Sequence, residues 1–310
     1  MLFMKDMKKY LAVDIGGSKT HMTVFCESGV IYEDEVAGVG LAAESDADLP
    51  IYREALSEIA REYEISAACI NLGGRNAQQI RRVTESVLRD VPVLVVRESE
   101  GDAAFAFGSL VGARLVLLAG TGTIACAASD KGKCIFGGWG MNIGDGGSGY
   151  DIGLCAIRET LLALDGTDAL TPLQREISGL DAPILPTEDA KEICSLRDAV
   201  RARLCHTDRR AVASLVKTVV AHAEKGEADA LSILAEAGRR MGALVIGGIK
   251  KMGLSAESTV AVTGGLVNVL PYFKQEFENT VKKETGVSRF VYEKDGLMRG
   301  IMMLAKELEK

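Results

Sequence analysis

Short apolar runs interrupted by glycine-containing turns recur along this chain and predict two successive β-meanders. The first meander takes its strands from 10–13, 20–25 and 30–36. The second takes its strands from 115–119, 124–128 and 134–136. Because the two meanders lie about a hundred residues apart and share one strand–turn–strand plan, they indicate two similar halves.

Between and after the meanders, apolar residues three or four positions apart predict helices, and shorter apolar runs predict strands. The predicted helices are 51–63, 77–89, 103–110, 154–164, 190–225, 228–251, 272–285 and 297–308. The predicted strands are 66–72, 91–96, 259–262 and 288–292, and the proline-containing stretch 165–187 is predicted to be a partly irregular connection. Strands that alternate with helices after a meander predict an α/β fold with mixed sheets flanked by helices.

The length of 310 residues is enough for two domains that each bury a core. We place 1–112 in an N-terminal domain and 113–296 in a C-terminal domain. The closing helix, within residues 297–310, is expected to pack back on the N-terminal domain.

Composition narrows the class of protein. Hydrophobic residues make up 47% of the chain and charged residues 25%, which is ordinary for a globular protein. A net charge of −7 and the lack of a basic stripe argue against a nucleic-acid partner. No apolar run approaches a membrane span, and residues 1–9 are too short and too charged for a secretory signal. The seven scattered cysteines contain no C-x-x-C and indicate reduced thiols, so we expect a cytoplasmic protein with no membrane partner.

The turn between the first two strands, called here the first glycine turn (residues 14–20), offers unobstructed N–H groups and hydroxyls that suit phosphate oxygens. Asp14 ends the first strand, where its carboxylate can hold a Mg²⁺ ion through water. A dinucleotide fingerprint would open a helix and a Walker loop needs a different motif, so neither is present. Alone, the turn is more simply a tight β-turn without a ligand. The predicted nucleotide-binding residues here are Asp14, Gly16, Gly17, Ser18, Lys19 and Thr20.

The second meander repeats this feature in the second glycine turn (residues 120–123). Its predicted nucleotide-binding residues are Gly120, Thr121, Gly122 and Thr123. If the halves are pseudo-symmetric, both turns face one cleft, and Gly264 and Gly265 lie near the flat base of the same nucleotide. Such a clamp needs only a metal and a proton-accepting carboxylate for phosphoryl transfer.

Asp102 is the candidate catalytic base. It lies between a predicted strand and a predicted helix, at the edge of the expected cleft. The alternative interpretation is a helix N-cap or a solvated charge beside Glu98 and Glu100.

The glycine-rich segment (residues 137–153) reads GGWGMNIGDGGSGYDIG and contains the only tryptophan. Dense glycine allows backbone to approach a small polar ligand closely. Trp139 can cover a sugar face, and Asp145 can accept hydrogen bonds from hydroxyls. The alternative is a glycine-rich loop around one core tryptophan.

The motifs DIGGSKT, LAGTGT, GGWGMNIGDGGSGYDIG and VTGGLVN occur in the order and spacing of the BadF/BadG/BcrA/BcrD-type ATPases. The chain resembles this family over nearly its whole length, and most closely its N-acetylglucosamine kinase branch, within the actin/hexokinase/Hsp70-like superfamily. The resemblance implies two ribonuclease-H-like domains, with ATP and Mg²⁺ in the interdomain cleft, and a homodimer. It also implies an ATP-dependent sugar kinase acting on an amino sugar or related hexose, with N-acetylglucosamine or glucosamine as the expected substrate.

By the same resemblance, Ser18 and Thr121 contact phosphates and Asp102 in EGDAAFAFG is the catalytic base. The resemblance implies sugar binding at Gly73, Gly74, Gly138, Trp139, Gly140 and Asp145.

The chain departs from the family pattern at three places. The loop 38–43 lacks the usual asparagine, Gly146 replaces an acidic residue, and Asp151 replaces an aromatic residue. A missing hydrogen-bond partner strongly changes the affinity for one sugar. We therefore expect these departures to affect the specificity for N-acetylglucosamine more than they affect the kinase reaction.

Two other functions remain open at this level. The first is an ATPase that drives a partner enzyme, as the dehydratase activators of the wider family do, although the cluster-binding cysteine motif of those proteins is absent. The second is a sugar or nucleotide sensor without turnover.

Overall fold

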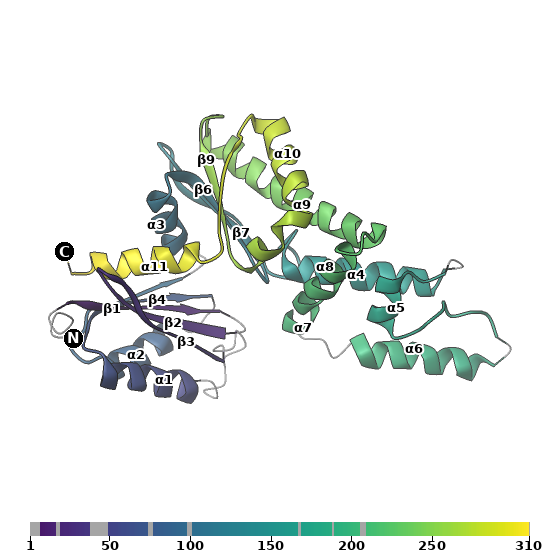
Figure 1. Cartoon of the computed structure of the whole chain (residues 1–310), viewed down its shortest axis with the longest axis horizontal. Helices are drawn as coiled ribbons and strands as arrows, with labels where there is room; N and C mark the ends of the chain where they lie inside the picture. The colour runs from purple at the N-terminus through teal and green to yellow at the C-terminus, as the bar shows by residue number, and fades with distance from the viewer. Residues whose placement is uncertain are drawn as a thin grey trace. The chain divides into compact units, whose positions relative to one another are not determined.

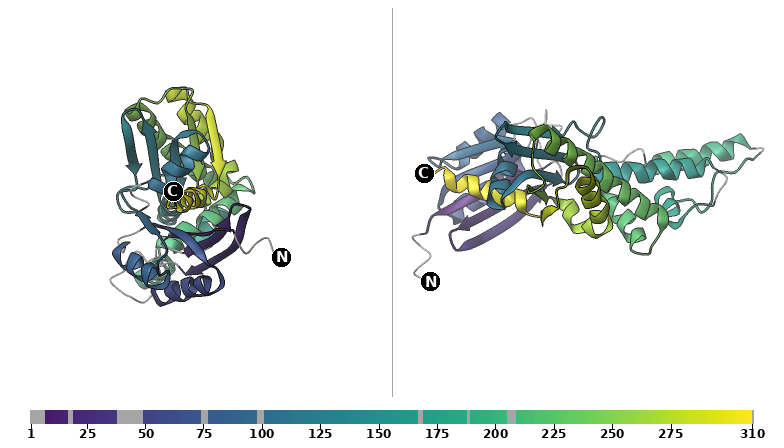
Figure 2. Two further views of the ribbon diagram at one scale, coloured as in Figure 1. Left: turned by 90° about the vertical axis from the view of Figure 1, so that its left-hand side faces the viewer. Right: turned by 90° about the horizontal axis from the view of Figure 1, so that it is seen from above.

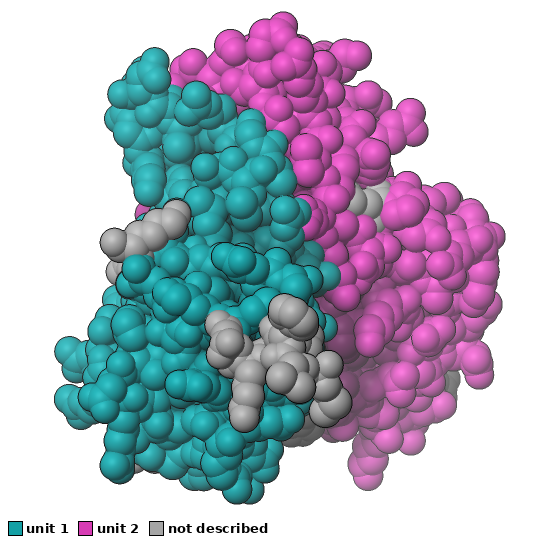
Figure 3. Space-filling view, turned by 60° about the vertical axis from the view of Figure 1, so that its left-hand side comes forward, with its two compact units in different colours: residues 1–116, 126–135, 295–310 teal, residues 117–125, 136–294 magenta. Residues whose placement is uncertain are grey.

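The computed structural model describes residues 7–16, 19–37, 49–73, 77–97, 101–166, 169–187, 189–204 and 209–309. The chain divides into two compact units. The first comprises 1–116, 126–135 and 295–310, and the second comprises 117–125 and 136–294 (Figure 3).

The first sheet has five strands in the order β3-β2-β1-β4-β5 (Figure 1). They are β1 (Lys9–Ile15), β2 (Lys19–Cys26), β3 (Gly29–Ala37), β4 (Ile65–Leu72) and β5 (Val93–Arg97). The antiparallel meander β1-β2-β3 confirms the sequence prediction, and β4 and β5 continue the sheet in parallel with β1.

Alternation along β1 directs its side chains to two different cores. Leu11 and Val13 pack with α1 (Leu49–Glu62) and α2 (Ala77–Val87) on one face of the sheet. Tyr10 and Ala12 point to the other face, which α11 (Gly296–Glu307) covers (Figure 1 and Figure 2). α3 (Asp102–Leu110) packs against α11 and adds Ala103 to the same buried cluster. The first unit is therefore a sheet between two helical layers, and α11 brings the end of the chain onto it.

The second sheet has the order β10-β9-β6-β7-β8, which repeats the plan of the first sheet. Its strands are β6 (Ala113–Ala119), β7 (Thr123–Ser129), β8 (Gly132–Gly137), β9 (Thr259–Thr263) and β10 (Arg289–Glu293). In each sheet the first meander strand is central, with the rest of the meander on one side and two later strands on the other. The predicted α/β fold with two mixed sheets flanked by helices is confirmed.

The helices of the second unit follow the prediction less closely. They are α4 (Gly149–Leu164), α5 (Pro172–Ser178), α6 (Ala190–Leu204), α7 (Arg209–Ser214), α8 (Val216–Ala223), α9 (Ala228–Met252), α10 (Lys274–Thr285) and the 3-10 helix η3 (Gly265–Tyr272). Within the described ranges, no helix combines the length and apolar character needed to cross a lipid bilayer.

The predicted single helix 190–225 is wrong, because the structure has α6, α7 and α8 in its place. At the α7–α8 junction the N–H of Leu215 donates to the carbonyl of Val212 at 3.1 Å, a tight turn that interrupts the α-helical pattern. The same carbonyl lies so close to α4 that a Cβ on Gly153 would be 2.0 Å from it. The break between α7 and α8 therefore lies at a close contact with α4, and the spacing of apolar residues cannot predict such a contact.

Two further helices differ from the sequence prediction. The predicted irregular connection contains α5, whose Thr171 and Gln174 form a capping box before Pro172 at its first turn. α4 begins at Gly149, not at 154, because Ser148 caps it by accepting from the N–H of Asp151 at 3.2 Å. The end of the glycine-rich segment is therefore the first turn of a helix.

The buried His222 of α8 gives the second unit a pH-dependent contact. Its Nε2 lies 2.8 Å from Glu176 and its Nδ1 lies 2.8 Å from Glu227. Burial lowers the pKa of His222, but the two carboxylates together outweigh burial and raise it above the ordinary value. The stabilisation is therefore present below the unfolded pKa, about 6.5, and is lost as the pH rises through the folded value.

We expect His222→Gln to be destabilised by roughly 1 kcal/mol at pH 6, with a smaller deficit at pH 9, because only the charged imidazole strengthens both contacts. Urea unfolding of both proteins at the two pH values measures the difference. A deficit that grows toward pH 9 would contradict this prediction.

Candidate functional site

The carboxyl edge of the first sheet gathers polar side chains from β1 and β4. Asp14 and Asn71 are register partners near the ends of these parallel strands, and Asn71 Nδ2 donates to Asp14 Oδ1 at 2.8 Å. Burial raises the pKa of Asp14, while the hydrogen bond from Asn71 and the charges of His21 and Lys19 act in the opposite direction. Asn71 was missed by the sequence prediction, which treated it as part of a buried strand.

Asp102 lies at the same edge, because α3 begins just after the parallel strand β5. The N-cap position of α3 belongs to Gly101, so the interpretation of Asp102 as the N-cap is wrong. Burial and the charge of Asp102 raise the pKa of Cys69 in β4 to about 12. Asp102 is half-buried and has no hydrogen-bond or ion-pair partner among the described residues. Glu98 and Glu100 lie outside the described residues.

The first glycine turn is described only in part, since Gly17, Ser18 and Gly74 lie outside the described residues, as does the loop 38–43. Gly16 N–H donates to the carbonyl of Lys19 at 2.9 Å and closes the turn. Gly73 N–H donates to the carbonyl of Ile15 at 3.0 Å, which holds the end of β4 against the turn. Thr20 has a fully buried hydroxyl without a hydrogen-bond partner among the described residues, and Lys19 is paired with Glu35.

The second glycine turn is closed by a hydrogen bond from Gly120 N–H to the carbonyl of Gly122 at 3.0 Å. Gly149 N–H also donates to Gly120 O at 2.8 Å, so the first turn of α4 lies directly against the loop. The N–H groups of Thr121 and Gly122 donate to no acceptor within the described ranges. Two such neighbouring donors, beside the buried hydroxyl of Thr123 that has no partner among the described residues, suit the oxygens of an anion.

Asp145 is held against this second turn. It is only 4% exposed, its Oδ1 accepts from Thr123 N–H at 3.4 Å, and its Oδ2 accepts from Arg209 Nη2 at 3.1 Å. Arg209 belongs to α7 and was missed by the sequence prediction, because no local motif connects it to the turn. The structure therefore joins the glycine-rich segment, the second glycine turn and α7.

Gly264 ends β9 beside the end of β6. Its φ is +106°, and a Cβ there would lie 2.6 Å from the carbonyl oxygen of Ala119. The chain at this position can approach the start of the second glycine turn only because residue 264 is glycine. The structure thus brings Gly264 and Gly265 next to residues 120–123.

Trp139 is 75% exposed, so its interpretation as a core residue is wrong. Its neighbours Gly138 and Gly140 have φ values of +68° and +91°, and Gly138 N–H donates to the carbonyl of Thr123 at 3.0 Å. The indole is therefore presented outward from a backbone anchored to the second glycine turn.

The comparison with protein families decides the family. The profile of the BadF/BadG/BcrA/BcrD ATPase family matches residues 11–294. This chain belongs to that family. The match runs through both glycine turns and the glycine-rich segment, so the motifs noted in the sequence are those of this family.

Known relatives of this BadF/BadG/BcrA/BcrD family member cover it almost completely. An N-acetylmuramic acid/N-acetylglucosamine kinase from Clostridium acetobutylicum is 26% identical, over 97% of this chain and 99% of the relative. A crystal structure of a candidate N-acetylglucosamine kinase from Chromobacterium violaceum has a TM-score of 0.71 at 21% identity, covering 96% and 99% of the two chains. A second candidate, from Porphyromonas gingivalis, has a TM-score of 0.68 at 16% identity, covering 96% and 99%. The structures show that the fold is shared.

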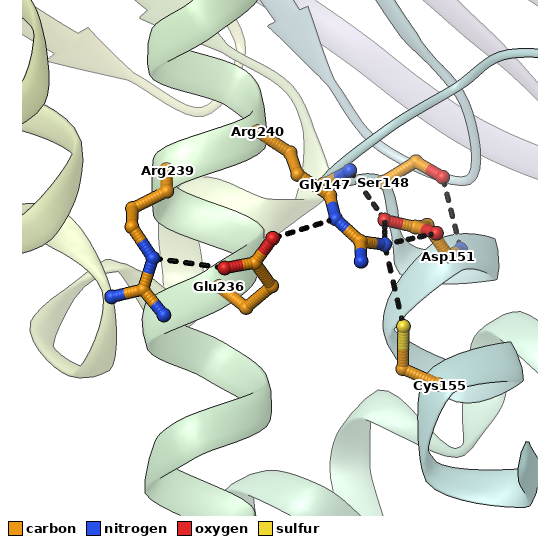
Figure 4. A network of polar contacts seen from close by, with 7 residues as sticks. All are labelled: Gly147, Ser148, Asp151, Cys155, Glu236, Arg239 and Arg240. Carbon is orange, nitrogen blue, oxygen red and sulfur yellow. Dashed lines mark hydrogen bonds and ion pairs between the residues drawn. The ribbon is translucent and has the colours of Figure 1, made fainter.

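In this BadF/BadG/BcrA/BcrD family member, α4 and α9 hold the end of the glycine-rich segment (Figure 4). Gly147 N–H donates to Asp151 Oδ2 at 2.8 Å, and Arg240 Nη1 lies 2.9 Å from each oxygen of Asp151. Arg240 also donates from Nε to Glu236 at 3.0 Å and from Nη1 to Cys155 Sγ at 3.4 Å. Asp151, where the family usually has an aromatic residue, therefore supplies the carboxylate that Arg240 of α9 binds.

We expect Arg240→Met to lower the free energy of unfolding by about 1–2 kcal/mol, because the mostly buried Asp151 loses a charged partner. Arg239→Met is the matched control: Arg239 precedes Arg240 on α9 and makes only exposed pairs, worth about 0–1 kcal/mol. Urea unfolding measures both variants, and equal losses would contradict a special role for Arg240.

The predicted site residues thus fall into two groups. Asp14, Gly16, Gly73 and Asp102 lie at one edge of the first sheet, whereas residues 120–123, Asp145 and Gly264 surround one loop of the second unit. That the two glycine turns face one cleft stays a prediction. No cluster of three or more His, Cys, Asp or Glu that could hold a metal is present in the described part of the chain. The role of Asp14 as a metal ligand acting through water stays a prediction.

Proposed function

We propose that this chain is an ATP-dependent sugar kinase that transfers the γ-phosphate to a hydroxyl of an amino sugar or related hexose. The main support is the second glycine turn, where Thr121 and Gly122 keep two amide donors unpaired within the described residues. Membership of an ATPase family and full-length similarity to a kinase of N-acetylmuramic acid and N-acetylglucosamine agree with this function.

In this proposal the nucleotide phosphates are held by the two glycine turns, and Gly264 and Gly265 lie near the adenosine. The buried hydroxyls of Thr20 and Thr123, which have no partner within the described ranges, fit additional oxygen partners there. Mg²⁺, when bound with ATP, spreads the phosphate charge, and Asp14 holds its hydration shell. The hydrogen bond from Asn71 orients the Asp14 carboxylate for this role.

The sugar is assigned to Gly73, Gly74 and the glycine-rich segment, where the exposed Trp139 covers an apolar sugar face. Asp145 already accepts two hydrogen bonds, and a carboxylate has about four acceptor positions, so two remain for sugar hydroxyls. Asp102 accepts the proton of the attacking hydroxyl, because no described partner occupies its carboxylate.

A coupled assay of ADP release, with ATP, Mg²⁺ and a panel of amino sugars and hexoses, tests this function. A sugar kinase releases ADP only with its sugar. Release that is equal with and without sugar would identify an ATPase that drives another protein, and no release with any sugar would favour a sensor. The homodimer also stays a prediction, and light scattering of the purified protein measures the oligomer.

A further inference from the structure

We propose that Arg209 of α7 binds an anionic oxygen of the nucleotide phosphates on the second glycine turn. This inference rests on the proposed function and adds a ligand-binding residue that none of the sequence motifs contains. Its basis is the geometry of one guanidinium, one carboxylate and one loop within the second unit.

The guanidinium lies directly against the loop. Arg209 Nη2 is 3.1 Å from Asp145 Oδ2. A Cβ added to Gly122 would lie only 2.7 Å from the same Nη2 atom, and 3.1 Å from Asp145 Oδ2. A side chain at residue 122 would therefore collide with the ion pair, and glycine leaves the space that the guanidinium occupies.

Arg209 has hydrogen-bonding capacity that no described residue uses. A guanidinium carries five N–H donors. One of its Nη groups donates to Asp145, whereas the buried Nε has no hydrogen-bond acceptor among the described residues. A buried N–H without an acceptor is costly, so a ligand oxygen at this position relieves the cost. The amides of Thr121 and Gly122 belong to the same loop and also donate to no described residue.

The arginine is carried by a helix that is fixed to the loop. α7 approaches α4 so closely that a Cβ on Gly153 would lie 2.0 Å from the carbonyl oxygen of Val212. α4 in turn begins under the loop, where Gly149 N–H donates to Gly120 O at 2.8 Å. Asp145 therefore orients the guanidinium, and α4 fixes its distance from the second glycine turn.

A cation in this position has a clear use in phosphoryl transfer. Arginine binds phosphate through strong charge-assisted hydrogen bonds, and neutralising phosphate charge is a main part of this catalysis. A carboxylate on the sugar presents the same kind of oxygen. We assign the nucleotide as the source, because the amides of Thr121 and Gly122, which donate to no described residue, belong to the turn for which the family resemblance implies phosphate binding.

Arg209→Met removes the cation, and Arg209→Lys keeps the charge without the guanidinium. Arg209→Met/Asp145→Asn removes both charges, so that no unpaired carboxylate is left to unfold the site. Arg210→Met is the control, because it removes one positive charge from the exposed residue that follows Arg209 on α7. Titration calorimetry measures the dissociation constants of ATP and adenosine for each protein, with Mg²⁺ present.

We expect ATP binding to weaken at least tenfold in Arg209→Met and in the double variant, and less in Arg209→Lys, while adenosine binding stays unchanged. Arg210→Met is expected to bind both ligands like the wild type. Unchanged ATP binding in both Met variants, or parallel losses of ATP and adenosine, would overturn the inference and leave only a structural ion pair.

The source of the oxygen is tested separately with N-acetylglucosamine and N-acetylmuramic acid, which differ by a carboxylate-bearing substituent. A rise in KM confined to the carboxylated sugar would overturn the assignment to the nucleotide. If the wild type binds ATP but phosphorylates no sugar of the panel, the proposed function fails while the binding comparison still decides the role of Arg209.

Discussion

Asp102→Asn is expected to reduce sugar-dependent ADP release by about 10³-fold, because an amide cannot accept the proton of the attacking hydroxyl. The loss should appear in kcat, with ATP affinity nearly unchanged, since Asp102 is assigned to the hydroxyl and not to the phosphates. Steady-state kinetics with a saturating sugar, together with calorimetric ATP titration, measures the two quantities.

Asp130→Asn is the control for this substitution. Asp130 is an exposed residue in the turn between β7 and β8, and the same change there should leave kcat within about twofold of the wild type. Wild-type turnover in Asp102→Asn would rule out the assigned role, and a parallel loss of ATP binding would show that the substitution damages more than the base.

Gly300→Ala is expected to be the most damaging small substitution in the first unit. A Cβ on Gly300 in α11 would lie 1.9 Å from the carbonyl oxygen of Ala103, which belongs to α3. Alanine improves helix propensity by about 1 kcal/mol, but overpacking against a backbone costs about 1–3 kcal/mol or more. We expect a net loss of roughly 2 kcal/mol and a melting midpoint about 5 °C lower.

Gly247→Ala is the matched control, because Gly247 is also inside a helix, α9, and no atom lies within 4 Å of its added Cβ. Here only the propensity gain remains, so the melting midpoint should stay the same or rise. If Gly300→Ala melts like Gly247→Ala, α11 does not pack on α3 as described. Because α3 begins with Asp102, the Gly300 variant should also lower kcat, whereas the Gly247 variant should not.

Most of the fold could be predicted from local patterns. Strand alternation and glycine turns predict both meanders and the α/β class, because alternating burial and turn formation depend on residues that are neighbours in the sequence. The capping box at Thr171 and Gln174 is an equally local signal, but the prolines around it favour an irregular connection. The single helix 190–225 failed for a different reason, since apolar spacing does not show where a close helix contact breaks the pattern.

The chain's sequence by itself determined which loops carry glycine, where the carboxylates Asp14, Asp102 and Asp145 fall, and the family resemblance. Only the tertiary structure decided the contacts between distant residues. Asn71 donates a hydrogen bond to Asp14, Arg209 donates to Asp145, and Gly300 lets the carbonyl of Ala103 approach α11 closely. Each pair joins residues far apart in the chain. Their partnership depends on the packing of whole elements, and a local pattern of apolar and polar residues contains no information about that packing.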